Sequence, residues 1–240
     1  MAIPLSTIRS QVRSYVDESS PSDWTNAELN TLINQRYHRV YTTIVTVFED
    51  YYLTTTQFNT VASQQEYGTS DSFPSDLYKL RRVEINYDVS GSNSVPLRAL
   101  PLTSLELIRR DIAQTNVGVK IFTTPYYYLL GVNKIGFIPI PDKAGTNAVK
   151  VWYVKTLADL SSDSSNIDIP YPERYWHIIA EGATADALRF GQQESIDADK
   201  FDAKFDRGLV LMQQELEDKI ADETKYVVDV TDMVLDFSTY

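Results

Sequence analysis

Apolar residues recur at helical spacing in the N-terminal fifth of the chain. Four of them follow Pro4 and predict a first helix over residues 6–18: Leu5, Ile8, Val12 and Val16. Thr25 and Glu28 then form a capping box, in which the two side chains satisfy free backbone N–H groups at the start of a longer second helix. The stripe that this helix is expected to bury is Leu29, Ile33, Tyr37, Val40, Tyr41, Ile44, Val47, Phe48 and Tyr51.

Two more helices are predicted near the C-terminus. One starts near Glu173. Small residues such as Ala180 and Gly182 let the backbones of other helices approach it closely. The other covers about residues 194–222 and has an acidic face opposite its apolar stripe. That stripe is Phe201, Phe205, Leu209, Met212, Leu216 and Ile220.

The middle of the chain has the period-two alternation that is typical of half-buried strands. Strands are predicted over residues 53–58, 83–87 and 149–154, with a turn at residues 73–77. A hairpin is predicted from residues 126–130 and 135–138, joined by a loop that starts at Gly131. A second capping box, Thr103 to Glu106, predicts a short helix that ends near Arg110.

This order of elements predicts an α+β fold. A lone amphipathic helix cannot leave its apolar face exposed, so the terminal helices are expected to pack into one helical bundle, formed by residues 1–52 and 170–225. Residues 53–169 are then a β-rich insertion. Residues 226–240 follow as a strand-like apolar tail with no further element to cover it, so the tail is expected to bind a partner. The apolar residues expected to make this contact are Tyr226, Val228, Val230, Met233, Leu235 and Phe237.

Composition narrows the function. The chain has no cysteine, so thiolate chemistry is excluded. It has only two histidines, so the side chains that usually transfer protons or bind zinc are scarce. A net charge of −11 argues against a surface that grips nucleic acid, although an acidic protein can surround DNA without binding it tightly. No apolar run approaches the ~18 residues of a membrane span, and the first residues do not resemble a signal peptide. We therefore expect a soluble protein without membrane contact.

No catalytic motif emerges, so no catalytic, cofactor-binding or metal-binding residue is assigned. Nucleotide-binding glycine loops, hydrolase elbows and zinc-protease motifs are all absent from the sequence. Two possible metal sets are interpreted instead as solvent-facing polar residues: Glu173, His177 and Glu181 on one helical face, and Asp159, Asp163, Asn166 and Asp168 in a Ser/Asp-rich linker. A hydrolase would need a carboxylate pair such as Asp76 with Glu84, and the spacing does not favour that pair.

Aromatic residues leave one alternative open. Tyr126, Tyr127 and Tyr128 could stack on sugars, which would make the chain a receptor- or carbohydrate-binding module of a virion or tail. In a strand, however, alternate residues point to opposite faces, which favours ordinary packing. An exposed, coplanar row of tyrosines would distinguish the binding module. The basic pairs at residues 81–82 and 109–110 are too few for a nucleic-acid footprint and favour salt bridges between subunits.

A series of short motifs resembles the head-to-tail adaptor (connector) proteins that tailed bacteriophages place beneath the portal. In order, the motifs are Trp24-Thr25-Asn26-Ala27-Glu28-Leu29 with Leu32-Ile33-Asn34, Glu66-Tyr67 with Phe73-Pro74-Ser75-Asp76-Leu77, Tyr128-Leu129-Leu130-Gly131 with Ile135-Gly136-Phe137-Ile138-Pro139-Ile140-Pro141, and Ile167-Asp168-Ile169-Pro170. Each motif is short, and the resemblance rests on the order in which the motifs occur along most of the chain. The family offers no catalytic residue to transfer.

The resemblance implies a non-enzymatic structural protein of the virion, made in the host bacterial cytoplasm. It implies a homo-oligomeric ring, typically of twelve copies, that binds the portal protein on one side and a tail nozzle or stopper protein on the other. The helical bundle would form the body of the ring, and genomic DNA would pass through its lumen without specific binding. An acidic lumen would let DNA slide. No cofactor is expected.

Overall fold

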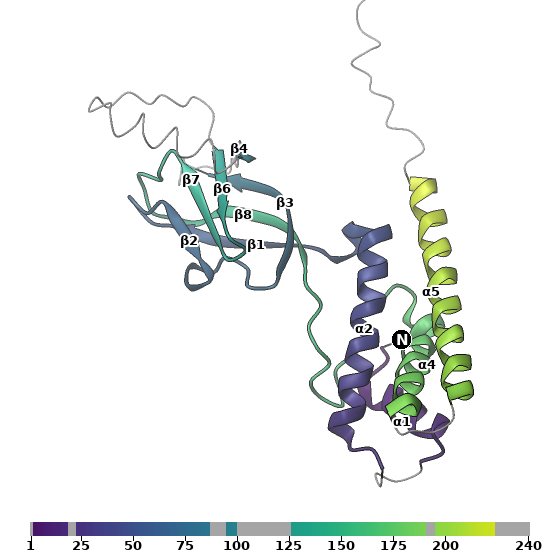
Figure 1. Cartoon of the computed structure of the whole chain (residues 1–240). Helices are drawn as coiled ribbons and strands as arrows, with labels where there is room; N and C mark the ends of the chain where they lie inside the picture. Colours follow the sequence, from purple (N-terminus) through teal and green to yellow (C-terminus); the bar gives the residue numbers. More distant parts are fainter. Residues whose placement is uncertain (1, 19–22, 87–94, 100–125, 191–194, 224–240) are drawn as a thin grey trace, which may run out of the picture. The chain divides into compact units, whose positions relative to one another are not determined.

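The computed structural model describes residues 2–18, 23–86, 95–99, 126–190 and 195–223 (Figure 1). Helices and two small sheets are both present, so the predicted mixture of helix and strand is confirmed. The chain forms two compact units. Met1–Tyr51 and Ala158–Tyr240 form one, here called the helical unit, and Tyr52–Leu157 forms the other, here called the strand unit. Residues 158–169 thus belong with the helices, whereas the sequence pattern assigns them to the strand-rich part.

Four α-helices make up the described part of the helical unit: α1 (Leu5–Tyr15), α2 (Asn26–Val47), α4 (Pro172–Phe190) and α5 (Ser195–Glu223). Helix α4 contacts the other three, and α2 also contacts α1 and α5 (Figure 1). Helix α1 ends at Tyr15, earlier than the Glu18 that the pattern predicts. The chain leaves the helix there because Asp17 adopts a positive φ of 56°.

The start of α2 shows the predicted capping box. The Thr25 hydroxyl accepts a hydrogen bond from the Glu28 amide at 3.2 Å, and the Glu28 carboxylate accepts one from the Thr25 amide at 2.8 Å. The predicted stripe is buried from Leu29 to Ile44. The helix ends at Val47, however, and Tyr51 belongs to a separate 3₁₀ turn, η1 (Glu49–Tyr52), because Phe48 leaves helical backbone geometry with φ −135° and ψ 77°.

Two glycines allow close packing of α4 and α5, as the small residues of α4 predict. A Cβ atom on Gly182 would lie 2.8 Å from a ring carbon of Phe205 and 2.9 Å from the Cδ of Arg36. A Cβ atom on Gly208 would overlap the side chain of Ile178. Any larger side chain at either position would therefore push the helices apart.

The strand unit contains two four-stranded sheets. One has the order β1-β8-β3-β4, from Leu53–Thr60, Gly145–Lys155, Leu77–Ile85 and Val95–Pro96. The other has the order β2-β7-β6-β5, from Glu66–Gly68, Lys134–Ile138, Tyr126–Leu130 and Arg98–Ala99. The pairs are antiparallel except β5 with β6, which is parallel. The predicted hairpin is confirmed, and Gly131 supplies its turn with a φ of 64°.

Both sheets contribute to one apolar core. The rings of Phe58, Tyr67 and Phe137 meet at its centre, with centroids 5.5–6.4 Å apart. The other buried members are Phe73, Val83, Ile85, Leu97, Ile135, Val149, Val151 and Tyr153. The predicted strand over residues 83–87 is longer and starts at Leu77. Register shifts between Leu77 and Lys79 and between Leu80 and Arg82 break the alternation there and hide the strand's first half in the sequence.

Candidate functional site

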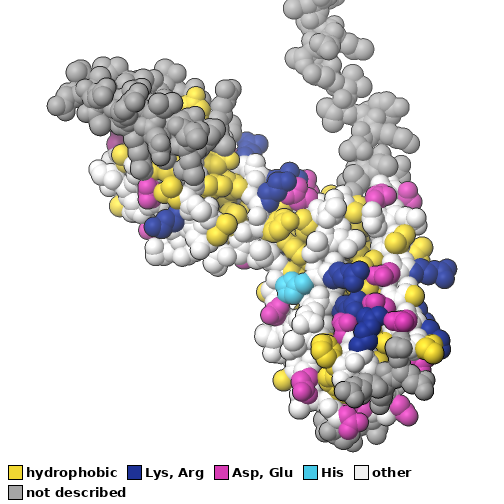
Figure 2. Space-filling model, viewed as in Figure 1, with side chains coloured by type: hydrophobic (Ala, Val, Ile, Leu, Met, Phe, Trp, Pro, Cys, Tyr) yellow, Lys and Arg dark blue, Asp and Glu magenta, His cyan; other side chains and the backbone are white. Residues whose placement is uncertain are grey.

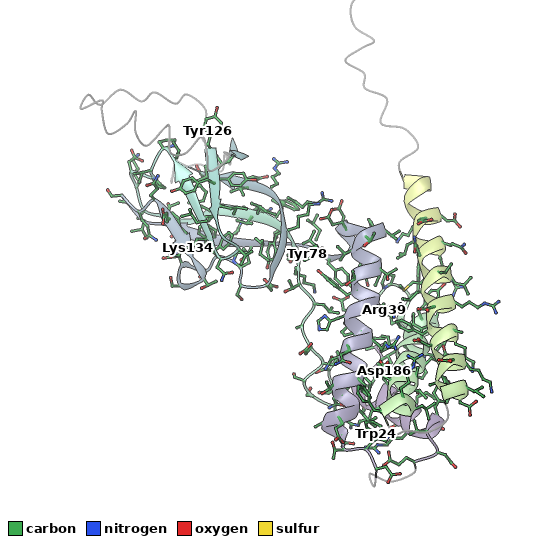
Figure 3. The ribbon with its side chains drawn as sticks, viewed as in Figure 1. Trp24, Arg39, Tyr78, Tyr126, Lys134 and Asp186 are labelled. Carbon is green, nitrogen blue, oxygen red and sulfur yellow. The ribbon has the colours of Figure 1, made fainter. Side chains whose placement is uncertain are left out.

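A buried arginine lies where three helices of the helical unit meet. Arg36 of α2 is 7% exposed. Its Nε and Nη2 atoms donate to the two carboxylate oxygens of Asp186 on α4, at 2.6 and 2.5 Å, and Nη1 donates to Asp202 on α5 at 2.8 Å. The guanidinium also lies 4.8 Å from the ring centroid of Phe205. Arg36 therefore ties α2, α4 and α5 together. Its partner Asp186 is labelled in Figure 3.

Further ion pairs extend this cluster toward the surface. Arg189 donates to Asp202 and to Asp199, both at 3.0 Å, and Arg39 donates to Asp206 at 3.1 Å. Burial by itself would raise the pKa of Asp202, but hydrogen bonds from Arg189 and the charge of Arg36 outweigh burial and lower the pKa below its usual value. On the face that Figure 2 shows, basic and acidic side chains of the helical unit lie side by side.

The segment from residue 158 to residue 170 is tied to α1 and α2. The Asn34 side chain accepts from the Leu160 amide at 2.8 Å and donates to the Leu160 carbonyl oxygen at 3.3 Å. The Ile167 amide donates to the Ile3 carbonyl oxygen at 3.0 Å. Leu160, Ile167 and Ile169 are buried. Asp159, residues 161–164 and Asn166 are exposed, as the interpretation as a solvated Ser/Asp linker predicts, whereas the apolar residues of the segment pack against the helices.

The possible calcium residues of that segment are engaged with the helices instead. Asp163 pairs with Arg9 at 2.9 Å, and Asp159 lies 2.6 Å from the Nε2 atom of His38. The Asp168 amide donates to the Tyr37 hydroxyl at 2.6 Å. The segment thus holds the start of α1 and the middle of α2 together.

The hydroxyl of Tyr37 gives the helical unit a pH dependence. Burial raises the pKa of Tyr37 far above its usual value of 10, and burial with the nearby charge of Asp168 raises the pKa of Tyr51 to about 12. Above pH 10 the unfolded chain releases these protons and the folded chain keeps them, so stability falls as pH rises. We expect Tyr37→Phe to reduce the drop in melting temperature between pH 9 and pH 11. An unchanged drop would contradict this assignment.

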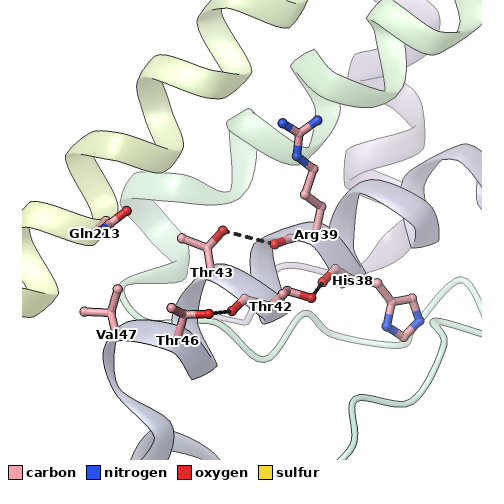
Figure 4. A pocket seen from close by; sticks show the side chains of 7 residues that line it. All are labelled: His38, Arg39, Thr42, Thr43, Thr46, Val47 and Gln213. Atoms are coloured by element: carbon pink, nitrogen blue, oxygen red, sulfur yellow. Dashed lines mark hydrogen bonds between the residues drawn. The ribbon is translucent and has the colours of Figure 1, made fainter.

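A groove opens beside the ion pairs, between α2 and α5 (Figure 4). Its volume is about 580 Å³, and it is lined by His38, Arg39, Thr42, Thr43, Thr46, Val47 and Gln213. Each threonine hydroxyl donates to the carbonyl oxygen four residues earlier, at 2.8–3.2 Å. With their hydroxyl protons bound to the helix, the threonines offer the groove mainly their methyl groups.

The groove lacks the arrangement of a hydrolase. His38 and Asp159 form a histidine–carboxylate pair, but the Thr42 hydroxyl donates to the backbone oxygen of His38 at 3.0 Å rather than to its ring. Among the residues that line the groove, no hydroxyl is therefore activated by the imidazole. Sequence reasoning did not find this groove or the Arg36 cluster.

The carboxylate pair that a hydrolase would need, Asp76 with Glu84, is not formed. Asp76 accepts a hydrogen bond from the Tyr153 hydroxyl at 2.9 Å, whereas Glu84 pairs with Arg82 at 2.7 Å. The two carboxylates lie near opposite ends of β3, and a strand rises by about 26 Å over the eight residues between them. No substrate could bridge them in the way that acid–base catalysis requires.

The possible metal residues on α4 do not form a site either. Glu173 and His177 are exposed, and Glu181 is half-buried. In the part of the chain that the structure describes, no three or more His, Asp or Glu side chains are grouped so that they could hold a metal ion.

The three consecutive tyrosines do not form an exposed row. Tyr127 packs against the apolar core, and Tyr128, 1% exposed, lies over Gly136, with its hydroxyl 3.4 Å from Glu66. Tyr126 is half-buried at the edge of the strand unit (Figure 3). Alternation in the strand thus sends neighbouring rings to opposite faces, as the sequence predicts.

Three predicted features lie outside the described part of the chain: the apolar tail at 226–240, the short helix that starts at the Thr103–Glu106 capping box, and the basic pair at 109–110. The other basic pair is described, and its Arg82 pairs within its own strand, with Glu84.

Comparison with known protein families gives a match over most of the chain. No curated protein matches the chain, but a family model described as SU10 adaptor protein matches residues 3–226, which include residues of both units. In the described residues, no helix has the length and apolar character needed to cross a membrane. The chain therefore belongs to the SU10 adaptor protein family, a family of structural components of the phage particle rather than of enzymes.

Proposed function

We propose that this protein forms an adaptor ring that joins the phage portal to the tail. The family match over residues 3–226 carries this proposal. The ring would contain about twelve copies, with the portal protein on one side and a nozzle or stopper protein on the other. The terminal helices would form its body as one bundle, and the strand unit would be an insertion in that bundle. The Arg36 cluster supports this role, because a ring that transmits force needs helices that do not slide.

The lumen of the ring would be part of the DNA channel. A chain with a net charge of −11 repels phosphates at long range, so DNA would slide past it without sticking. Weak binding of DNA by the assembled ring, without steep dependence on salt, is the behaviour that this part of the proposal requires.

The tail at residues 226–240 would bind the portal. Its alternate apolar side chains suit addition to a strand or insertion into a groove, and either would remove them from water. The receptor- or carbohydrate-binding alternative has less support, because the tyrosines of β6 pack against the strand unit and do not offer a stacking surface.

The mass of the full-length protein, measured alone and then with the purified portal protein of the same phage, tests the proposal. We expect a multimer of about twelve copies bound to the portal. A chain that stays monomeric and unbound across a range of concentrations and salt would contradict it. Binding of the free chain to cell-surface glycans with no affinity for the portal would favour the receptor-binding alternative.

A further inference from the structure

Strand β1 gives the strand unit a long free edge. It has eight residues and pairs with β8 on one side only (Figure 1). The other strands that end a sheet in the described part of the chain are much shorter, since β4 and β5 have two residues each and β2 has three. Among the described edges, β1 is therefore the longest, and it is long enough to pair with a further strand.

The sequence of β1 has none of the residues with which proteins usually protect an edge. It contains no charged residue, no proline and no glycine. Four of its residues are threonines, whose branched side chains favour strand pairing. By contrast, β4, which forms the other edge of the same sheet, contains Pro96. An unprotected edge of this length is a site to which another strand can add.

The outer backbone groups of β1 have no partner in the described part of the chain. In an antiparallel pair, every second residue points its N–H and C=O groups away from the neighbouring strand. The described backbone hydrogen bonds of β1 all go to β8. The side chains of Asn59 and Thr60 also bond toward β8, to the Asn147 amide and the Lys143 carbonyl oxygen. Apart from water, only another extended chain satisfies such a row of donors and acceptors.

The side chains of β1 indicate which kind of strand fits beside it. Phe58 belongs to the apolar core, and Thr54 and Thr56 are half-buried on the same face. The exposed residues of the opposite face are Leu53, Thr55 and Gln57. An added strand therefore gains most from apolar side chains on the core side and tolerates polar side chains on the other.

The C-terminal sequence has this alternation, although it lies outside the described residues. Residues 232–239 contain no proline or glycine. In an extended chain, one face has Met233, Leu235 and Phe237, and the other has Asp232, Val234, Asp236 and Ser238. β1 has no acidic residue that would repel the two aspartates. Eight residues match the length of β1, and residues 224–231 connect them to the end of α5 at Glu223.

We infer that, before the chain binds the portal, residues 232–239 add to the free edge of β1 as a further strand. Pairing removes Met233, Leu235 and Phe237 from water and covers the unprotected edge, and either one left exposed would promote aggregation. The inference goes beyond the proposed function, in which the portal binds the tail. Here β1 holds the second half of the tail, while Tyr226, Val228 and Val230 lie outside the paired segment.

Amide hydrogen exchange of the free chain, measured by mass spectrometry, tests the pairing without knowledge of its register. We expect deletion of residues 232–240 to speed exchange in residues 53–60 at least about tenfold, because the outer amides of β1 lose their partners. Residues 134–138 of β7, which has a strand on both sides, should exchange at the same rate in both chains. A synthetic peptide with the sequence of residues 232–240 should restore slow exchange of β1.

A double variant, Leu235→Pro with Asp236→Pro, tests the backbone bonds themselves. Neighbouring residues of a strand point their N–H groups to opposite sides, so two consecutive prolines remove a donor that faces β1 in any register. We expect this variant to expose β1 as the deletion does. The matched control, Leu235→Ile with Asp236→Asn, keeps both N–H groups and should leave β1 protected.

Dilution identifies the chain that supplies the tail. Slow exchange that persists on dilution assigns the tail to its own chain, and slow exchange that is lost assigns it to a neighbouring copy; both results support the pairing. Equal exchange of residues 53–60 in the full-length, shortened and proline chains would overturn the inference. The adaptor function would then be unaffected, because binding to the portal is measured separately and does not depend on β1.

Discussion

Replacement of Arg36 with leucine is expected to lower the free energy of unfolding of the helical unit by about 3 kcal/mol. Removing one partner of a buried ion pair costs about 3–5 kcal/mol, because the remaining charge stays in a poorly solvated site. Here Asp186 and Asp202 keep 18% and 25% of their side chains exposed, which places the loss at the lower end. Chemical unfolding followed by circular dichroism at 222 nm measures it.

Arg39→Leu is the matched control. Arg39 is three residues from Arg36 on the same helix, but its pair with Asp206 is 54% and 55% exposed, so its loss should cost less than about 1 kcal/mol. Acid should also weaken the Arg36 cluster. The folded chain holds Asp202 ionised more readily than the unfolded chain does, which stabilises the fold at pH values above the usual Asp202 pKa of 3.8. This stabilisation is lost as the pH falls through the lowered pKa of Asp202 in the folded chain. Equal losses for the two arginine variants would contradict the role given to Arg36.

Deletion of residues 226–240 is expected to weaken binding to the portal at least about 100-fold. Burial of a large apolar side chain contributes about 1.5–3 kcal/mol, so losing even two of the six in the tail removes enough energy for that change. Binding is measured by surface plasmon resonance with immobilised portal. The secondary structure of the shortened chain should stay unchanged, because the deletion begins after the end of α5 at Glu223.

A double variant, Asp229→Asn with Asp232→Asn, separates apolar burial from charge in the tail. It keeps all six apolar residues and should bind within a few-fold of the wild type. If the deletion leaves portal binding unchanged, the tail has another role. If the double variant loses binding as strongly as the deletion, charge rather than burial carries the contact.

Local signals in the sequence were sufficient for several elements. Thr25 and Glu28 marked the start of α2 because a capping box depends only on neighbours in the chain. Gly131 marked the hairpin, because few other residues adopt its positive φ. The small residues of α4 indicated close packing, and Gly182 shows the contact with Arg36 and Phe205 that requires it.

The Arg36 cluster was missed because its members are far apart in the chain. Arg36 and Asp186 are separated by 150 positions, and no local pattern connects them. One signal was nevertheless present: Arg36 falls between Ile33 and Tyr37, on the stripe that α2 was expected to bury. A charged residue on a buried stripe requires a partner of opposite charge, which Asp186 provides from the Ala-rich helix.

The polar residues of the segment 158–170 are mostly exposed, as their composition indicates, but composition did not reveal that the apolar residues between them are buried. The run of serines and aspartates suggested a solvated linker, yet Leu160, Ile167 and Ile169 are the buried residues of that segment. The Leu160 amide donates to the Asn34 side chain of α2, and the Ile167 amide donates to the Ile3 carbonyl oxygen just before α1, so both partners are far away in the sequence and only the folded structure reveals them. The register shifts of β3 hid part of a strand for a similar reason, since they depend on pairing with β8.

The first and last strands of the strand unit are partners. Leu53 at the start of β1 pairs with Val154 near the end of β8, so the chain enters and leaves this unit at adjacent positions, about 5 Å apart. A segment with neighbouring ends behaves as a cassette. Because its two ends are adjacent, this unit can be lengthened, shortened or replaced without changing the path of the chain through the helical unit. If it were removed, a short turn could join the two chain ends that it leaves.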